Sequence, residues 1–239
     1  TQEVNLAPKE RKTVVFTPDT HKALELKSPR LWWPNNYGRQ ELYTMDVVVA
    51  EKGVPSDSKK VRFGVRELSY ELEVCFPDDS IRRVEYRPTV MRQGEPIFDN
   101  INRKYIEGGM CMPRLKKNVS SDILVPAPDK AMQHYMVIKV NGRRIFCKGG
   151  NWGMDDAMKR VSREHLEPYF RLHKEANFNM IRNWTGESTE ESFYELCDEY
   201  GLYVVDEANV ESHGIGYDPR ESLANRPEWT HVFIDRTER

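Results

Sequence analysis

The sequence has 239 residues, of which 38% are hydrophobic, and its 14 glycines bring the apolar fraction near that of globular proteins. A chain of this length is expected to form one large domain or two ordinary ones. Its 36 basic and 38 acidic side chains give a net charge of −2, which excludes the basic field typical of nucleic-acid-binding proteins, and no run of 18 apolar residues predicts a transmembrane helix.

The first 70 residues have the pattern of a β-rich domain. Residues 12–16 and 42–49 are rich in β-branched and aromatic side chains, and residues 61–66 alternate between apolar and polar. Turn-forming residues separate these runs, as at 34–38. Short antiparallel strands at this spacing predict part of an immunoglobulin-like β-sandwich. Because the strands are too few for a complete sandwich and the sequence does not begin with Met, we expect an internal piece of a longer protein.

Residues 71–135 have a weaker pattern. Residues 71–74 alternate, residues 83–86 do so less clearly, and prolines, glycines and polar side chains without a clear period make up much of the rest. We expect a long connecting segment with some strand content, since a structureless linker of this size is unusual inside a compact protein.

Strand and helix signals alternate over residues 136–239. The alternation begins with two short runs rich in apolar residues, 136–140 and 143–147, on either side of Asn141-Gly142. Asn-Gly between two such runs is the strongest short-range signal of a β-hairpin, because both residues tolerate the positive φ of a type I′ turn. The sequence therefore predicts a hairpin at this point.

Two helices and a strand between them are predicted next. The first helix is expected over residues 163–176, with Ser162 as its N-cap, and a short strand follows at 178–181. Ser188 and Glu191 have the spacing of a capping box, which predicts the start of the second helix. The apolar stripe of the first helix is formed by Leu166, Tyr169, Phe170, His173 and Ala176.

The second helix is predicted to end at Gly201, and a buried strand follows at 202–205. A third helix is expected to begin near Pro227 or Glu228. This repeated β-α order predicts a parallel sheet with crossover helices. A closed barrel and an open doubly wound sheet both satisfy it, but no Gly-x-Gly-x-x-Gly or Walker-type loop follows any strand, which argues against an α/β nucleotide enzyme. One face of the second helix carries Phe193, Leu196, Cys197 and Tyr200.

Polar side chains gather where each of three successive strands is predicted to end. Residues 149–156, 182–185 and 206–214 follow these strands. In a (β/α)8 barrel the functional groups come from the carboxyl ends of the strands and the loops after them. All three segments contain Asn and two contain Trp, and an amide beside an aromatic ring is typical of a sugar-binding site.

Each of these residues taken alone has another interpretation. Core packing explains Trp152 about as well as substrate contact does. A structural ion pair is the commoner role for an arginine such as Arg182, and a lone histidine such as His213 is more often structural. The hypothesis of a site depends on three polar clusters at the same end of three successive strands.

Several long motifs resemble glycoside hydrolase family 2. Residues 29–38, Pro-Arg-Leu-Trp-Trp-Pro-Asn-Asn-Tyr-Gly, and residues 62–67 resemble its immunoglobulin-like domain. Residues 141–152, 179–184 and 194–201 resemble the start of its (β/α)8 barrel. The motifs are long and occur in the order that the family has, and the similarity covers most of the chain.

This resemblance implies a multidomain protein of the β plus α/β class. A partial immunoglobulin-like β-sandwich is expected over residues 1–70, a connecting segment over 71–135, and the first, incomplete part of a TIM (β/α)8 barrel over 136–239. The implied function is that of a fragment or subunit of a retaining β-glycosidase.

Two branches of the family are mixed in the motifs. Residues 149–156 and 182–184 resemble the β-mannosidase-like branch, which includes plant endo-β-mannosidases, whereas residues 206–214 resemble bacterial β-galactosidases. A Trp-Asn-Asp-Phe-type sequence, expected after the third strand of the mannosidase-like branch, does not occur here. Both β-mannosides and β-galactosides therefore stay open as substrates.

Carried over position by position, the resemblance implies a substrate-binding role for the polar clusters. Arg182 would hold the nucleophilic carboxylate, Asn151 and Trp152 would line the −1 sugar subsite, and His213 would bond sugar hydroxyls. The full set of expected substrate-binding residues is Asn151, Trp152, Asp156, Arg182, Asn183, Trp184, Asp206, Asn209 and His213.

The implied mechanism requires two carboxylates about 5–5.5 Å apart. In the family both are glutamates on later barrel strands, after an Asn-Glu pair, and neither Glu207 nor Glu211 matches them. We therefore expect no catalytic residue in this sequence, with both glutamates beyond Arg239, and no metal ion or cofactor. The expected partners are a β-linked oligosaccharide and the remaining chain or subunits of the same enzyme, with neither nucleic acid nor a membrane. The alternative is a non-catalytic carbohydrate-binding or interaction module.

Overall fold

The computed structural model describes residues 1–88, 97–105, 111–117, 119, 125–126, 136–153, 158–184, 188 and 190–206. The chain divides into two compact units, Thr1–Arg30 and Leu31–Arg239. The first unit contains the short 3-10 helix η1 (Lys22–Leu24) and mostly exposed side chains. The strand predicted over residues 12–16 is not formed there, because a β-branched run becomes a strand only where another strand pairs with it. No helix in the described part of the chain is long and apolar enough to cross a membrane.

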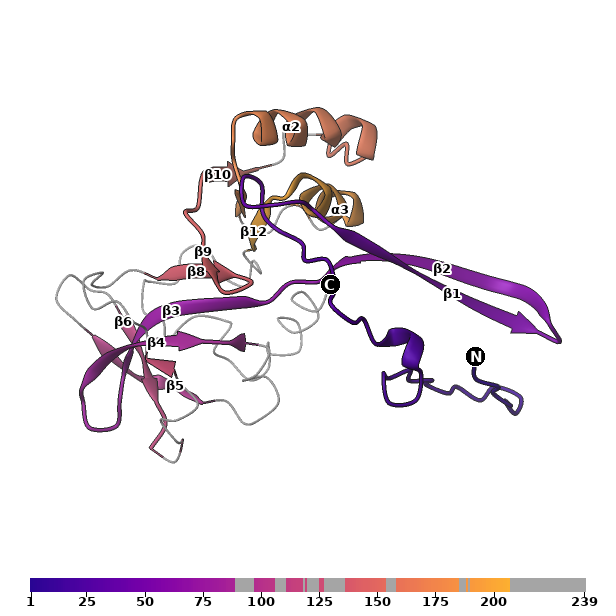
Figure 1. Ribbon diagram of the computed structural model, residues 1–239, viewed down its shortest axis with the longest axis horizontal. Coiled ribbons are helices and arrows are strands. Elements are labelled where there is room, and N and C mark those ends of the chain that lie inside the picture. The colour runs from indigo at the N-terminus through magenta and orange to yellow at the C-terminus, as the bar shows by residue number, and fades with distance from the viewer. Residues whose placement is uncertain are drawn as a thin grey trace. The chain divides into compact units, whose positions relative to one another are not determined.

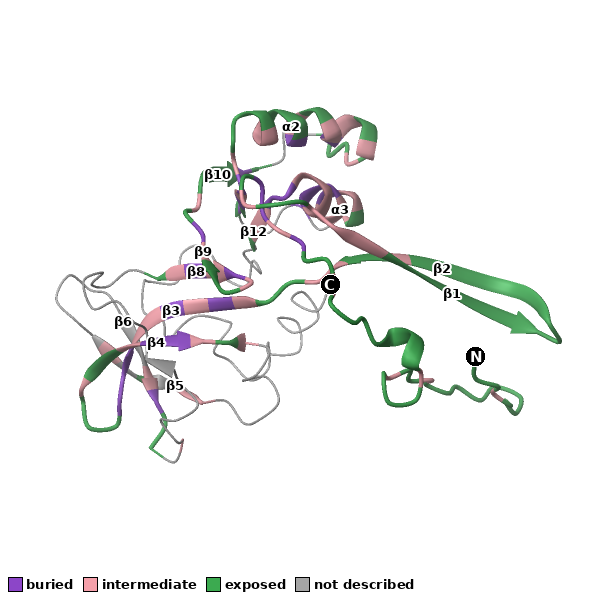
Figure 2. Ribbon diagram, viewed as in Figure 1, coloured by how far each residue is buried: buried purple, intermediate pink, exposed green. Residues whose placement is uncertain are grey.

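The second unit begins with a long antiparallel hairpin, which Figure 1 shows as a two-stranded ribbon. Strand β1 (Leu42–Glu51) pairs with β2 (Val54–Gly64), and Lys52 and Gly53 make the turn with φ of 51° and 83°. The strand predicted over residues 42–49 is confirmed. Among the described residues these two strands pair only with each other, and their side chains are largely exposed (Figure 2).

A seven-stranded mixed sheet occupies much of the segment for which we expected a connection with some strand content. Its central strands run in the order β5-β6-β3-β4-β7, with β8 paired to β3 and β9 to β8. Val74, Phe76, Val84 and Leu115 form its apolar core. The strands are β3 (Leu68–Cys75), β4 (Ile81–Tyr86), β5 (Phe98–Tyr105), β6 (Cys111–Leu115), β7 (Val125–Pro126), β8 (Val137–Val140) and β9 (Arg143–Arg144).

The hairpin predicted at Asn141-Gly142 is confirmed. Asn141 and Gly142 have φ of 50° and 77°, as a type I′ turn requires. Strand β9 ends at Arg144, however, so the strand predicted to reach residue 147 is shorter. Because β8 pairs with β3, the hairpin belongs to the seven-stranded sheet, and a separate parallel sheet begins after it.

The alternation of strands and helices predicted for the last part of the chain is confirmed. Strands β10 (Gly149–Trp152), β11 (Met180–Asn183) and β12 (Tyr203–Asp206) are parallel and adjacent in that order. Helix α2 (Arg163–Glu175) connects the first pair and α3 (Glu191–Tyr200) the second. The third helix predicted near residue 227 lies outside the described residues.

Local signals set the first end of α2 and the last end of α3. The Ser162 hydroxyl accepts a hydrogen bond from the backbone N–H of His165, as predicted for the N-cap of α2. Gly201, with φ of 74°, ends α3 in the left-handed conformation, and its N–H donates to the carbonyl of Cys197.

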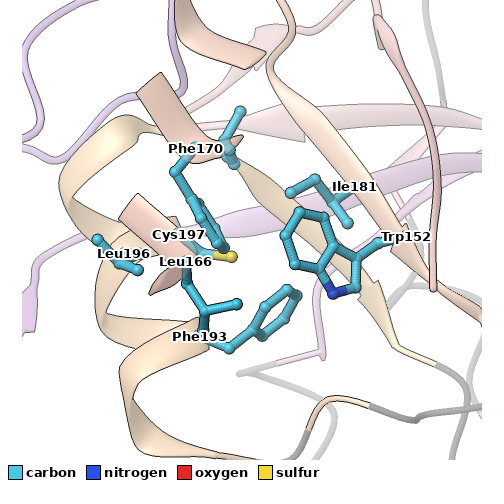
Figure 3. Close-up of a cluster of buried hydrophobic side chains, with 8 residues drawn as sticks. Trp152, Leu166, Phe170, Ile181, Phe193, Leu196 and Cys197 are labelled. Atoms are coloured by element: carbon cyan, nitrogen blue, oxygen red, sulfur yellow. The ribbon is translucent and has the colours of Figure 1, made fainter. Parts of the chain in front are cut away.

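Both helices cover one face of the parallel sheet and form its core. Figure 3 shows the ring of Trp152 packed beside Ile181 and Phe193, with Phe170 near by. Each fully buried side chain of this kind contributes about 1.5–3 kcal/mol of transfer free energy. The core consists of Trp152, Leu166, Phe170, Ile181, Phe193, Leu196, Cys197 and Leu202.

Residues 31–40, which the resemblance assigned to the immunoglobulin-like domain, contact the C-terminal ends of both helices. The indole N–H of Trp32 donates to the carbonyl of Asp198 at 2.7 Å. The side-chain amide of Asn35 donates to the carbonyls of Lys174 and Phe178 at 3.1 and 2.9 Å. The last carbonyls of a helix lack partners within it, so this segment satisfies groups that would otherwise need water.

An ion network also joins the hairpin to the helices. Arg62 of β2 lies 2.5 Å from a carboxylate oxygen of Glu199 on α3, and Arg163 of α2 bonds the other oxygen. Burial alone would raise the pKa of Glu199, but the hydrogen bonds and charges of Arg163 and Arg62 outweigh it and lower that pKa.

Replacing Asn35 with alanine is expected to lower the free energy of unfolding by about 1–3 kcal/mol, because the half-buried carbonyls of Lys174 and Phe178 each lose a hydrogen bond, and that of Lys174 keeps the N–H of Asn177. Asn36→Gly is the matched control. It removes an exposed bond to the carbonyl of Asn177 and suits the φ of 69° at this position, so it should change stability by less than about 0.5 kcal/mol. Urea unfolding measures both, and equal effects would contradict the role given to Asn35.

Glu199→Gln is expected to lower stability at pH 7 by about 1.5–3 kcal/mol, since two charge-assisted hydrogen bonds weaken. The folded pKa of Glu199 lies below its ordinary value of 4.5. The carboxylate therefore contributes fully to the free energy of unfolding above pH 4.5, and this contribution is lost as the pH falls through the folded pKa. The difference in free energy of unfolding between wild type and Glu199→Gln should therefore shrink below pH 4.5.

The control for this experiment is Glu175→Gln, which breaks the exposed pair with Arg171 on α2. Exposed pairs contribute about 0–1 kcal/mol, so this change should have little effect at either pH. A difference between wild type and Glu199→Gln that stays constant down to pH 3 would contradict the ion network.

Candidate functional site

The polar residues expected in loops after the first two parallel strands lie within the strands themselves. Asn151 and Trp152 are the last two residues of β10, and Arg182 and Asn183 are the last two of β11. The predicted strand boundaries were therefore wrong by several residues, because apolar runs such as 143–147 gave the stronger strand signal. Since side chains alternate along a strand, each pair divides between two faces of the sheet.

One face brings Asn151 and Arg182 together. The two residues are partners in the parallel register, and the guanidinium of Arg182 donates to the side-chain oxygen of Asn151 at 3.3 Å. The same guanidinium lies 5.8 Å from the ring centre of Trp184, which is 50% exposed. We call Asn151, Arg182 and Trp184 the polar triad.

The other face takes Trp152 and Asn183 into the core. Trp152 is 7% exposed and its indole N–H donates to the hydroxyl of Ser188 at 2.9 Å. Asn183 is fully buried, and its side chain donates to the carbonyl of Ser188 at 2.8 Å and accepts from its N–H at 3.2 Å. Asp206 ends β12 and pairs in register with Asn183. The structure thus separates the side chains of Trp152 and Asn183 from the polar triad.

Three of the expected site residues cannot be placed. Asp156, Asn209 and His213 lie outside the described residues, and they stay predictions.

Ser188 does not have the role predicted for it. The N-cap of α3 is Glu190, without a side-chain hydrogen bond, whereas Ser188 is 1% exposed and bonds two strands. The sequence offers no local signal for this, because its partner Trp152 is 36 residues away.

The face of the sheet that carries the polar triad has no acid among its described strand residues. Strand alternation places six residues on it, namely Gly149, Asn151, Met180, Arg182, Tyr203 and Val205. The hydroxyl groups of Tyr203 and Tyr70 are hydrogen-bonded at 3.1 Å. Burial is the main cause that raises the pKa of Tyr203, and this hydrogen bond is the second. Its hydroxyl is therefore protonated at neutral pH.

The side chains of the polar triad are of kinds that can bind a ligand. A guanidinium can hold a carboxylate by two parallel hydrogen bonds, an amide bonds hydroxyls, and an exposed indole packs against the apolar face of a ring. Within the described residues no group of three or more His, Cys, Asp or Glu is placed to hold a metal ion.

Two family models match this chain. The model described as "Glycosyl hydrolases family 2, TIM barrel domain" matches residues 132–239, and the one described as "Glycosyl hydrolases family 2" matches residues 1–66. The parallel strands and their helices lie within the first match, and the hairpin lies within the second. The chain belongs to glycoside hydrolase family 2.

Relatives in this family act on different sugars. A mannosylglycoprotein endo-β-mannosidase of Lilium longiflorum is 29% identical over 75% of this chain and 13% of its own length. An exo-β-D-glucosaminidase of Streptomyces avermitilis is 26% identical over 90% of this chain and 18% of its own length. A β-galactosidase of Vibrio cholerae is 38% identical over 42% of this chain and 10% of its own length. The chain thus spans less than a fifth of the length of each of them.

The backbones of β10 and β11 lie so close at Gly149 that there is no room for a side chain. A Cβ atom at Gly149 would lie 1.9 Å from the carbonyl oxygen of Met180, whereas one at Gly150 would meet nothing within 4 Å. Gly149→Ala is therefore expected to force the strands apart and to cost about 1–3 kcal/mol. Gly150→Ala should change stability by less than about 1 kcal/mol. Urea unfolding of both variants measures the difference, and equal stabilities would contradict the strand pairing.

Proposed function

We propose that this chain supplies part of the sugar-binding subsite of a retaining β-glycosidase that acts on β-mannosides or β-galactosides. The two catalytic glutamates are supplied by polypeptide outside this sequence. On its own the chain does not hydrolyse a glycoside.

The observation that carries this proposal is the pairing of Asn151 with Arg182 at the carboxyl ends of adjacent parallel strands. In barrels of this class the active site lies at that end of the sheet. Arg182 then holds the carboxylate of the nucleophile in place, and Asn151 bonds a hydroxyl of the sugar in the −1 subsite. Trp184 provides an aromatic surface beside them.

None of the six strand residues of this face is Asp or Glu, which supports the proposal that this chain supplies binding residues and that the catalytic glutamates come from outside this sequence. A retaining mechanism needs one carboxylate as nucleophile and another as acid and base, about 5–5.5 Å apart. Both would have to reach this face from strands or subunits that follow. The sugar preference of the relatives supports the general substrate class, a β-linked glycoside, and leaves the choice of sugar to experiment.

The test is complementation. The purified chain is assayed with nitrophenyl β-mannoside and nitrophenyl β-galactoside, alone and after addition of the remaining C-terminal part of the enzyme. We expect no turnover alone and turnover of one substrate after addition. In the complemented enzyme, Arg182→Ala should lower kcat by about 10²–10³-fold, as loss of a positioned charge does in other enzymes.

Arg171→Ala is the matched control, since this arginine pairs with Glu175 on the exposed side of α2. Its activity should equal that of the wild type. Turnover by the pure chain would refute the proposal. Binding of mannose or galactose oligosaccharides in a calorimetric titration, without any rescue of activity, would favour a non-catalytic carbohydrate-binding module instead.

A further inference from the structure

Ser188 lies at the centre of a buried network directly behind the polar triad. Its side chain and backbone bond Trp152 at 2.9 Å and Asn183 at 2.8 and 3.2 Å. The hydroxyl of Tyr194 on α3 also donates to the Ser188 carbonyl, at 3.4 Å. Ser188 therefore joins two strands through buried hydrogen bonds and a helix through a half-buried one.

The partners of Ser188 are the chain neighbours of all three members of the polar triad. Trp152 follows Asn151 directly, and Asn183 stands between Arg182 and Trp184. A movement of either buried side chain therefore moves the backbone that carries the exposed ones. The network acts where β11 ends, which is also where the chain turns and carries Trp184 toward the guanidinium of Arg182.

We propose that Ser188 is a positioning residue of the sugar-binding face. It fixes the ends of β10 and β11, so that Trp184 stays beside Arg182 and Arg182 stays beside Asn151. The importance of this for catalysis rests on the proposed function, but the positioning itself does not.

Energetic reasoning supports a positioning role over simple filling of space. The indole N–H of Trp152 and the amide of Asn183 are buried donors, and a buried donor without an acceptor is strongly disfavoured. The ends of β10 and β11 can therefore shift little relative to Ser188 while these bonds remain. An apolar side chain at position 188 would leave the indole N–H without this acceptor and so release the end of β10, while the bonds from the Ser188 backbone to Asn183 and Tyr194 would remain.

The test compares Ser188→Ala with Ser192→Ala in the whole chain. The hydroxyl of Ser192 donates to the carbonyl of Val161 at 2.8 Å, so this control also loses one hydroxyl hydrogen bond on the same part of the chain. The readout is the set of indole N–H signals in a nitrogen-15 NMR spectrum, in which the signal of Trp184 is the one that disappears in Trp184→Phe.

We expect the Trp184 signal to shift or broaden in Ser188→Ala and to stay in place in Ser192→Ala. Ser188→Thr, which keeps a hydroxyl acceptor, should restore the wild-type position. If the alanine variant does not fold, Ser188→Cys replaces it, because sulfur is a weaker acceptor. An unmoved Trp184 signal in the folded variant would overturn the proposal.

A second measurement separates this proposal from the proposed function. In the complemented enzyme with nitrophenyl β-mannoside or β-galactoside, kcat/KM should fall roughly tenfold to hundredfold in Ser188→Ala, as it does when reacting groups are misplaced. If the wild-type enzyme turns over the substrate and Ser188→Ala has the same kcat/KM, the positioning role is refuted. Absence of wild-type turnover together with a moved Trp184 signal would refute the proposed function and uphold the positioning.

Discussion

Parallel pairing of β10 with β11 is the constraint on which the polar triad, and with it the proposed sugar-binding face, depends. The register puts Asn151 opposite Arg182 and Trp152 opposite Asn183. Because side chains alternate, one pairing creates a polar, open pair and a buried pair at the same time. A one-residue slip of β11 would turn the charge of Arg182 into the core, and a one-residue slip of β10 would turn the ring of Trp152 out of it. The apolar core therefore selects the register that the site requires.

This core is supported from outside the parallel sheet. Helices α2 and α3 bury their apolar stripes against one face of the sheet. Side chains of residues 31–40 donate hydrogen bonds to carbonyls at and just after the helix ends. The segment that contains Trp32 and Asn35 precedes the barrel region by more than a hundred residues in the sequence. The β-rich part of the chain and the barrel part are thus joined by specific hydrogen bonds as well as by the covalent chain.

Sequence reasoning succeeded where the signal was local. Ser162, Gly201 and the Asn141-Gly142 turn each determine an element end through their own backbone and side-chain chemistry, and the structure has these ends where they were predicted. The helical stripes were equally clear. The alternation of strands and helices followed from these elements and predicted a parallel sheet, which the structure confirms for β10, β11 and β12.

Other features depend on contacts that are distant in sequence. Strand β10 has the sequence Gly-Gly-Asn-Trp, which has little intrinsic strand preference, and it forms because β11 pairs with it. Ser188 resembles a helix cap and instead bonds a tryptophan 36 residues away. Of the candidate site, the pairing of Asn151 with Arg182 could be expected from a parallel sheet, but the burial of Trp152 and Asn183 required knowledge of which residue of each strand faces the helices.

The most direct measurement is a crystal structure of the complete enzyme with a non-hydrolysable β-glycoside bound. The account predicts that the sugar lies over the face that carries Asn151 and Arg182, with the Arg182 guanidinium bonded to a glutamate from a later strand, and that Trp152 stays in the core. A sugar bound elsewhere, or Asn151 and Arg182 on strands that are not neighbours, would contradict it.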